Sequence, residues 1–216
     1  FRVGVSVGLI TKSIAKLNNL DEAIISHRLM GDFIPSEESY KLLIDKKINP
    51  SELNYKPYPF LLANTFEKKI IDESINDFQF EWKWDGIRIQ LIKRSGKVSI
   101  WTRGQDLVNK SFPELVEKIS SIKDDFVIDG ELLVWDFKEN LPLNFSLLQK
   151  RINRKAPSRS IQKSLPIIFI AYDLLEINGE DQRYSNLEIR RNNLEKHLCN
   201  WLNESKEELS NIFKIS

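Results

Sequence analysis

The chain has little cysteine, almost no excess of charge of one sign and no long apolar run. Its 216 residues include one cysteine, Cys199, which excludes a disulfide framework within the chain and makes a reducing, cytoplasmic location the simplest expectation. The 32 basic and 31 acidic residues leave a net charge of +1, which argues against a polybasic, histone-like binder. No apolar run approaches the roughly 18 residues that a membrane span requires, and no signal peptide is visible.

The composition is that of a folded globular protein rather than a disordered one. Hydrophobic residues make up 41% and charged residues 29% of the chain. At about 150 residues per domain, the length corresponds to roughly one and a half domains. The sequence begins at Phe1 rather than at methionine. We therefore expect the chain to be a piece of a longer protein, cut at both ends.

Residues 1–50 have the apolar spacing of helices. Apolar side chains recur at helical intervals, and Asp21 and Ser36 are suited to cap a second and a third helix. Three short helices bury little apolar surface, so we interpret them as the C-terminal part of a larger helical domain. Residues 51–59 are expected to form a linker, because prolines in and beside this segment prevent a regular helix.

From residue 60 onward the pattern is that of strands. Alternating apolar and polar residues predict strands at residues 78–84, 87–91 and 98–102, and residues 126–135 and 167–173 are predicted to form two further strands. Asp85-Gly86 predicts a turn after the first of these strands. Because short turns favour antiparallel pairing, we expect residues 60–216 to form an α+β domain with a mainly antiparallel sheet.

Two helices are predicted to flank this sheet. Ser111 and Ser185, each followed three residues later by a glutamate, indicate where these helices begin. We expect the helices to continue to about residues 122 and 202, where the apolar pattern ends.

The candidate chemistry centres on Lys83. This lysine precedes Gly86, where the backbone can approach a ligand closely, and it shares a strand face with Glu81. A lysine amine is a covalent nucleophile once it has lost its proton. Trp82 and Trp84, expected in the sheet core, would favour that loss by excluding water, whereas nearby carboxylates would oppose it. We therefore expect a bound metal to be needed for activation.

Charged side chains of other strands are predicted to face the same site. Arg88 and Arg103 can orient and neutralise phosphate oxygens. Asp129 and Glu131 share one face of their strand and can bind Mg²⁺ or ribose hydroxyls, although Asp129 is equally suited to pair with an arginine. One lysine, two arginines and several carboxylates form the mixture that phosphate chemistry requires.

Four segments resemble the motifs of a known family. The segment Lys83-Trp84-Asp85-Gly86-Ile87-Arg88 matches the K-x-D-G-x-R signature of the covalent nucleotidyltransferases, which include DNA ligases, RNA ligases and mRNA-capping guanylyltransferases. Further motifs follow in family order: Thr102-Arg103-Gly104, Asp129-Gly130-Glu131-Leu132 and Ala171-Tyr172-Asp173-Leu174-Leu175. Residues 101–104, 112–115 and 145–151 are similar to the ATP-dependent DNA ligases of bacteria, and residues 1–6 resemble the end of the DNA-binding domain in multidomain ligases. The resemblance covers nearly the whole chain.

The resemblance implies an ATP-dependent DNA ligase that seals nicks. Lys83 would attack the α-phosphorus of ATP, release pyrophosphate and carry AMP as a phosphoramidate. The AMP would then pass to the 5′-phosphate of a nick, where the 3′-hydroxyl displaces it. ATP and Mg²⁺ are thus the implied cofactors and nicked double-stranded DNA the implied partner, with a monomer as the expected state.

The resemblance also implies roles for five further residues. Glu81 would lie beside the adenine, and Tyr172 would stack on it, although Tyr172 could instead fill the core. Arg88 and Arg103 would hold ribose and phosphate. Glu131 would contact the ribose or a Mg²⁺ ion.

The chain departs from the family pattern after Tyr172. No E-G-x-x-x-K or K-x-K segment follows before Ser216, and no C-terminal OB-fold is present in the sequence. The lysines of those motifs would contact the α-phosphate. We therefore expect the 216-residue chain by itself to attach AMP poorly and not to seal DNA alone.

A run of basic residues stands apart from these motifs. No acidic residue occurs between Glu139 and Asp173. Such a run is usually a solvated loop, but here it is also suited to contact DNA phosphates. The predicted DNA-binding residues are Lys150, Arg151, Arg154 and Lys155.

Two alternatives remain open from the sequence. One is a related enzyme that acts on RNA, either an RNA ligase or an mRNA-capping guanylyltransferase. The other is a catalytically silent DNA-binding fragment, which the missing later motifs alone support. The helical N-terminal segment and residues 145–155 favour the DNA ligase.

Overall fold

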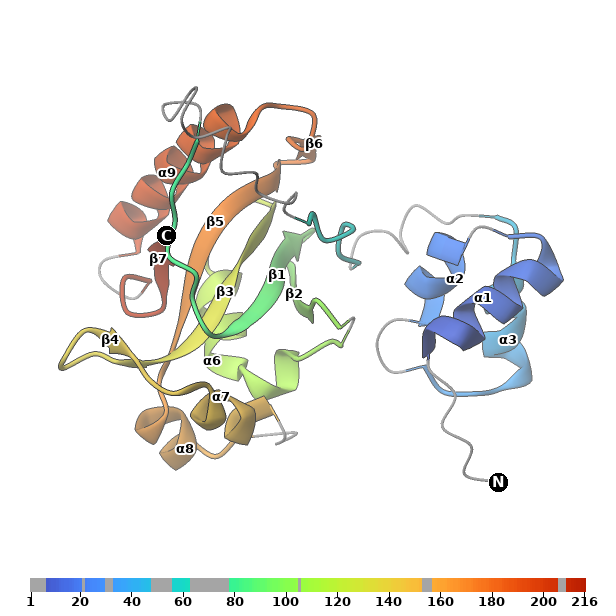
Figure 1. Ribbon diagram of the computed structural model, residues 1–216, viewed down its shortest axis with the longest axis horizontal. Helices are drawn as coiled ribbons and strands as arrows, with labels where there is room; N and C mark the ends of the chain where they lie inside the picture. Colours follow the sequence, from blue (N-terminus) through green and yellow to red (C-terminus); the bar gives the residue numbers. More distant parts are fainter. Residues whose placement is uncertain are drawn as a thin grey trace, which may run out of the picture.

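The computed structural model describes two groups of elements that follow one another along the chain (Figure 1). The described residues are 7–20, 22–29, 33–47, 56–62, 78–104, 106–152, 157–205 and 209–216. Three helices come first, and a sheet with its own helices follows. None of the helices in these described ranges is long and apolar enough to cross a membrane.

The first group confirms the three helices predicted from the sequence. These are α1 (Val7–Asn18), α2 (Glu22–Leu29) and α3 (Glu37–Ile44). They pack around Ala15, Ile25 and Leu43, one side chain from each helix, all of them buried. This core is small, and the assignment of these helices to a DNA-binding domain stays a prediction.

Ser36 caps α3, as the sequence predicted. Its hydroxyl accepts a hydrogen bond from the Ser39 amide at 3.0 Å, and the Ser39 hydroxyl accepts one from the Ser36 amide at 2.9 Å. This reciprocal pair satisfies backbone donors that the first turn leaves open. Asp21, the predicted cap of α2, lies outside the described residues.

The sheet of the second group is antiparallel except at one edge pair, which confirms the α+β prediction. Its order is β2-β1-β3-β5-β6, with β4 paired to β3 and β7 paired to β5; only the β5–β7 pair among these strands is parallel. The strands are β1 (Ile87–Arg94), β2 (Lys97–Thr102), β3 (Phe126–Asp136), β4 (Leu141–Pro142), β5 (Ile167–Ile177), β6 (Glu180–Asp181) and β7 (Phe213–Ile215).

The main core lies between one face of this sheet and the helices. Alternate residues of β1, β3 and β5 pack there with side chains of α6, α7 and α9. Figure 1 shows the long helix α9 beside β5, with α6 and α7 near the other end of the sheet. The helices are α6 (Pro113–Ser120), α7 (Phe145–Ile152), α8 (Arg159–Ser164) and α9 (Leu187–Glu204), with a 3₁₀ turn at Asn109–Ser111.

Two small apolar clusters lie apart from this core, on the opposite residues of the same strands. One contains Ile92, Trp101, Val127 and Leu175, with Tyr58 packed on it. The other contains Leu133, Trp135, Ile168 and Ile170, with Trp84 packed on it. The part of β3 between them carries polar side chains, so this second face has a polar band between two apolar clusters.

The strand predicted at residues 78–84 is wrong. Residues 78–85 have no regular secondary structure, and β1 begins only at Ile87. Phe80 is 67% and Trp82 is 80% exposed, so Trp82 is not in the sheet core, whereas Trp84 is half-buried as expected for a packed side chain. Alternation produces a strand only where a neighbouring strand pairs with it, and none of the described strands pairs with this segment.

The two predicted flanking helices exist, but neither begins with its predicted serine. Pro113 starts α6 after Phe112, without a side-chain cap. The N-cap of α9 is Asn186, whose side-chain oxygen accepts from the Ile189 amide at 2.9 Å. A proline at the first helical position and an asparagine N-cap both favour the start of a helix. Each helix therefore begins one or two residues after its predicted serine.

Candidate active site

Four polar side chains come together on the second face of the sheet. Arg88 lies on β1, Asp129 and Glu131 on β3, and Tyr172 on β5. Arg88 is directly opposite Glu131 in the strand register, and its guanidinium reaches Asp129. The structure therefore brings together three of the predicted site residues, Arg88, Glu131 and Tyr172, around Asp129.

Two glycines let the backbones of this region approach closely. A Cβ atom on Gly86 would lie 2.4 Å from the Leu132 carbonyl oxygen, and one on Gly130 would lie 2.5 Å from both the Ile170 carbonyl oxygen and the Phe169 ring. These distances are too short for any larger residue without a backbone shift. Gly86 and Gly130 are therefore required by packing at this site.

Arg88 is held by four groups. Its Nε and Nη2 donate to the Asp129 carboxylate at 3.3 and 2.6 Å, and its Nη1 donates to the Leu61 carbonyl at 2.8 Å. Its guanidinium carbon is 5.4 Å from the centre of the Phe60 ring and 5.7 Å from that of the Tyr172 ring. These are cation–π distances, so the orientation of Arg88 is fixed by the protein itself.

The two carboxyl groups of β3 have raised pKa values. Burial raises the pKa of Asp129 to about 6, although the hydrogen bonds from Arg88 act in the opposite direction. Burial also raises the pKa of Glu131 to about 7, against a hydrogen bond from the Gly86 amide and the charge of Arg88. Glu131 therefore changes its charge near neutral pH, where a bound cation would favour its ionised form.

Glu131 is suited to bind a magnesium ion together with phosphates. Mg²⁺ commonly takes one or two carboxylates and substrate phosphate oxygens, and it keeps several waters. Within the described ranges no group of three or more His, Cys, Asp or Glu side chains is placed to hold a metal ion. A single carboxylate such as Glu131 fits a phosphate-dependent site, and its role as a metal ligand stays a prediction.

Tyr172 reaches the site because β5 is irregular there. Asp129 pairs with Asp173 and Gly130 pairs with Ala171, so Tyr172 is the extra residue of a bulge. Burial and the nearby Asp129 carboxylate raise the pKa of the Tyr172 hydroxyl above that of an ordinary tyrosine. The half-buried ring is placed against Arg88, and stacking on adenine remains a prediction.

Lys83 is exposed, within a segment that is fixed on either side of it. On one side, Glu81 accepts a hydrogen bond from Arg191 of α9 at 3.1 Å. On the other, the Trp84 ring packs edge-on against Trp135 with the ring centres 6.0 Å apart. The Lys83 side chain is therefore not shielded from water by Trp82 and Trp84, contrary to expectation. The backbone around Lys83 is nevertheless held by the contacts on either side.

Arg103 follows the end of β2, next to Arg88. Its amide donates to the Arg88 carbonyl at 3.2 Å, and its side chain is exposed. The backbone contact places Arg103 at the same end of the sheet as Arg88, where an exposed guanidinium can reach a phosphate.

Arg151 was wrongly predicted to contact DNA. It is completely buried, and its guanidinium donates to the carbonyls of Leu165 at 2.9 Å and Ser111 at 3.0 Å and pairs with Glu114 at 2.6 Å. It joins α7 to neighbouring elements, which the helical spacing of its segment could not reveal. Lys150 is exposed, as a phosphate contact requires, and the other two residues of that set, Arg154 and Lys155, lie outside the described residues.

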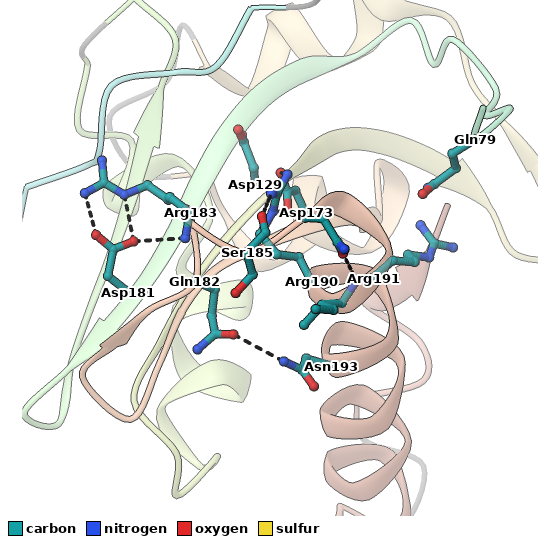
Figure 2. A network of polar contacts seen from close by, with 12 residues as sticks. Gln79, Asp129, Asp173, Asp181, Gln182, Arg183, Ser185, Arg190, Arg191 and Asn193 are labelled. Carbon is teal, nitrogen blue, oxygen red and sulfur yellow. Dashed lines mark hydrogen bonds and ion pairs between the residues drawn. The ribbon is translucent and has the colours of Figure 1, made fainter. Parts of the chain in front are cut away.

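Sequence reasoning missed the arginine pair at the start of α9. Arg190 donates to the Asp173 carboxylate at 2.7 and 3.0 Å (Figure 2). Arg191 binds Glu81 and also donates to the Ser216 carbonyl. Two consecutive arginines on an otherwise ordinary helix gave no signal of this kind, because their partners are distant in sequence.

Comparison with known proteins identifies a family for most of the chain. Residues 60–215 match the family model described as "ATP dependent DNA ligase domain". The chain belongs to this ATP-dependent DNA ligase domain family. The ligase domain covers most of the chain, including β1 to β7 and all the site residues discussed above.

Individual relatives are longer than this ligase-domain chain. A "Probable DNA ligase" of Koribacter versatilis (strain Ellin345) is 32% identical over 185 residues, which are 83% of this chain and 31% of the relative. A DNA ligase of Methanosphaera stadtmanae is 30% identical over 185 residues, or 81% of this chain and 32% of the relative. The chain thus spans about a third of the length of these curated relatives.

Solved structures of ligases are also similar to the chain. The ligase domain of M. tuberculosis LigD is 30% identical, with a TM-score of 0.44 over 56% of this chain and 36% of that one. A mycobacterial DNA ligase D complexed with ATP and MES is 29% identical, with the same TM-score and the same coverage.

Proposed function

We propose that the protein containing this chain is an ATP-dependent DNA ligase that seals nicks through an AMP adduct on Lys83. The observation that supports this most is the position of Lys83 beside β1, whose Arg88 lies with Glu131 and Tyr172 in a domain of the ligase family. In the first step, the Lys83 nitrogen loses its proton and bonds to the α-phosphorus of ATP, while the bond from this phosphorus to pyrophosphate breaks. AMP then passes to the 5′-phosphate of the nick, and the 3′-hydroxyl displaces it.

The polar band of the second face would hold the nucleotide during this step. Tyr172 offers an aromatic face for the adenine, and Glu81 lies on the same segment as the nucleophile. Arg88 and Arg103 would orient ribose and phosphate oxygens. Such fixed contacts lower the barrier by keeping the amine and the α-phosphorus in position.

Mg²⁺ belongs to the same proposal. When bound, it would neutralise phosphate charge as pyrophosphate leaves. Glu131 would hold it, since its half-buried carboxyl group gains a favourable partner on ionisation.

Nicked double-stranded DNA is the proposed substrate, bound by a monomer in the cytoplasm. Lys150 and the neighbouring basic residues Arg154 and Lys155 would contact backbone phosphates. Each contact of this kind makes binding weaker at higher salt, because the release of a condensed cation from the DNA gains less entropy when the surrounding solution already contains many cations.

A nick-sealing assay of the full-length protein tests this function. With ATP and Mg²⁺ we expect joining of a nicked DNA duplex, little joining of a nicked RNA duplex, and no use of GTP. Lys83→Ala should lose at least about a thousandfold in rate, because the covalent route through the lysine is removed. Lys97→Ala, at an exposed lysine of β2, is the matched control and should seal normally. Joining of RNA alone, or covalent labelling by GTP instead of ATP, would contradict the proposal.

A further inference from the structure

Residues 56–62 form a strap that runs along β1 on the second face. Three side chains on one face of β1 donate to backbone carbonyls of the strap: Arg94 to Lys56 at 3.3 Å, Gln90 to Tyr58 at 3.0 Å, and Arg88 to Leu61 at 2.8 Å. Alternate strand residues point to the same side of a sheet. These side chains therefore hold the strap along β1, and the chain direction of the strap is opposite to that of β1. The described part of the predicted linker is therefore attached to the sheet.

The first half of the strap is anchored through Tyr58. Its hydroxyl donates to the Glu176 carboxylate, which also accepts from Arg94 at 2.8 and 2.6 Å. The Arg183 guanidinium lies 3.8 Å from the centre of the Tyr58 ring, and the ring packs on the apolar cluster around Ile92. This end of the strap is consequently fixed by hydrogen bonds, charge and apolar contact together.

The second half of the strap meets the candidate active site at Phe60. Among the described residues, the Phe60 ring and the Tyr172 ring lie within 6 Å of the Arg88 guanidinium. Phe60 is half-buried and belongs to none of the apolar clusters found among the described residues. The contact with Arg88 therefore indicates a role for Phe60 other than filling an apolar core.

We propose that Phe60 is a positioning residue for ATP, which acts by fixing the Arg88 guanidinium beside Tyr172 in the nucleotide site. This inference rests on the proposed function, because ATP is the ligand that Arg88 would hold. Without the aromatic ring, Arg88 keeps Asp129 but loses one of the groups that restrict its orientation. ATP then binds a less ordered site, while the nucleophile Lys83 is unaffected.

The test measures steady-state nick sealing at varied ATP concentration, together with self-labelling by ATP, for the full-length wild type and its Phe60→Ala, Phe60→Leu and Phe60→Tyr variants. For Ala and Leu we expect the KM for ATP to rise about three- to tenfold, the range of a single cation–π contact, with kcat within about twofold. Tyr retains an aromatic face and should restore the wild-type KM. Leu62→Ala, in the same strap but 66% exposed, is the control and should match the wild type.

The outcomes separate this inference from the function on which it rests. If the wild type is labelled and Phe60→Leu keeps its KM, the aromatic contact has no role in ATP binding and the inference is overturned. The same follows if kcat falls while KM stays constant. If the wild type is not labelled by ATP at all, the proposed function fails and the inference fails with it.

Discussion

Single residues of this site are constrained by close contacts more than by charge. Gly130 separates Asp129 from Glu131, and it is the only residue type that leaves room for the Phe169 ring and the Ile170 carbonyl. Strand alternation places the two carboxylates on one face, and the glycine between them allows β5 to pack closely. The D-G-E motif is explained by packing at its middle position and by chemistry at its ends.

Gly130→Ala tests this packing requirement. The added methyl group would lie 2.5 Å from backbone and ring atoms, so we expect the free energy of unfolding to fall by about 2 to 3 kcal/mol, as for other overpacked cores. Urea denaturation measures this change. Gly104→Ala is the control, because its Cβ would lie at an ordinary 3.4 Å from its nearest neighbour; equal stability of the two variants would refute the packing argument.

At the scale of elements, ionic contacts connect segments that are separate in the sequence. Arg151 joins α7 to α6 through the Glu114 carboxylate. It also joins α7 to the end of α8, because it donates to the carbonyl of Leu165, the C-cap residue of α8. Arg191 similarly joins α9 to the segment that carries Lys83. These arginines determine where functional segments lie, although neither needs to touch a substrate.

Arg151→Ala distinguishes this structural role from the DNA contact predicted from the sequence. Removal of the guanidinium leaves Glu114 without its partner, so we expect a loss of about 2 to 4 kcal/mol in the free energy of unfolding. Lys150→Ala, one residue away and exposed, should leave stability within about 0.5 kcal/mol and weaken binding to nicked DNA. Unchanged stability of Arg151→Ala, measured by denaturant unfolding, would show that the buried pair is dispensable.

The elements that the sequence predicted well have strong local signals. Residues 126–135 and 167–173 read as strands because both of their faces are apolar along most of their length, and Ser36 was identified by its cap position. Residues 78–84 alternate just as clearly but have no paired strand. The bulge that directs Tyr172 and the strap that carries Phe60 depend on register and distant partners, which a single sequence does not contain.

On the scale of the whole molecule, the motifs of the sequence converge on one face of one sheet. Lys83, Arg88, Glu131 and Tyr172 are spread over ninety positions of the chain, yet β1, β3 and β5 are neighbours. The exposed Lys83 lies in the segment just before β1, and the face itself carries Arg88 and a carboxyl group, that of Glu131, which titrates near neutral pH. This arrangement is suited to transfer a nucleotide from ATP to the protein.

The most direct measurement of the central claim is the position of the covalently bound AMP. The full-length protein is incubated with ATP and Mg²⁺, digested under conditions that preserve the phosphoramidate, and its peptides are analysed by mass spectrometry. We predict AMP on the peptide that contains Lys83, and no adduct in the Lys83→Ala variant. AMP on another residue, or an adduct that survives in that variant, would contradict the account.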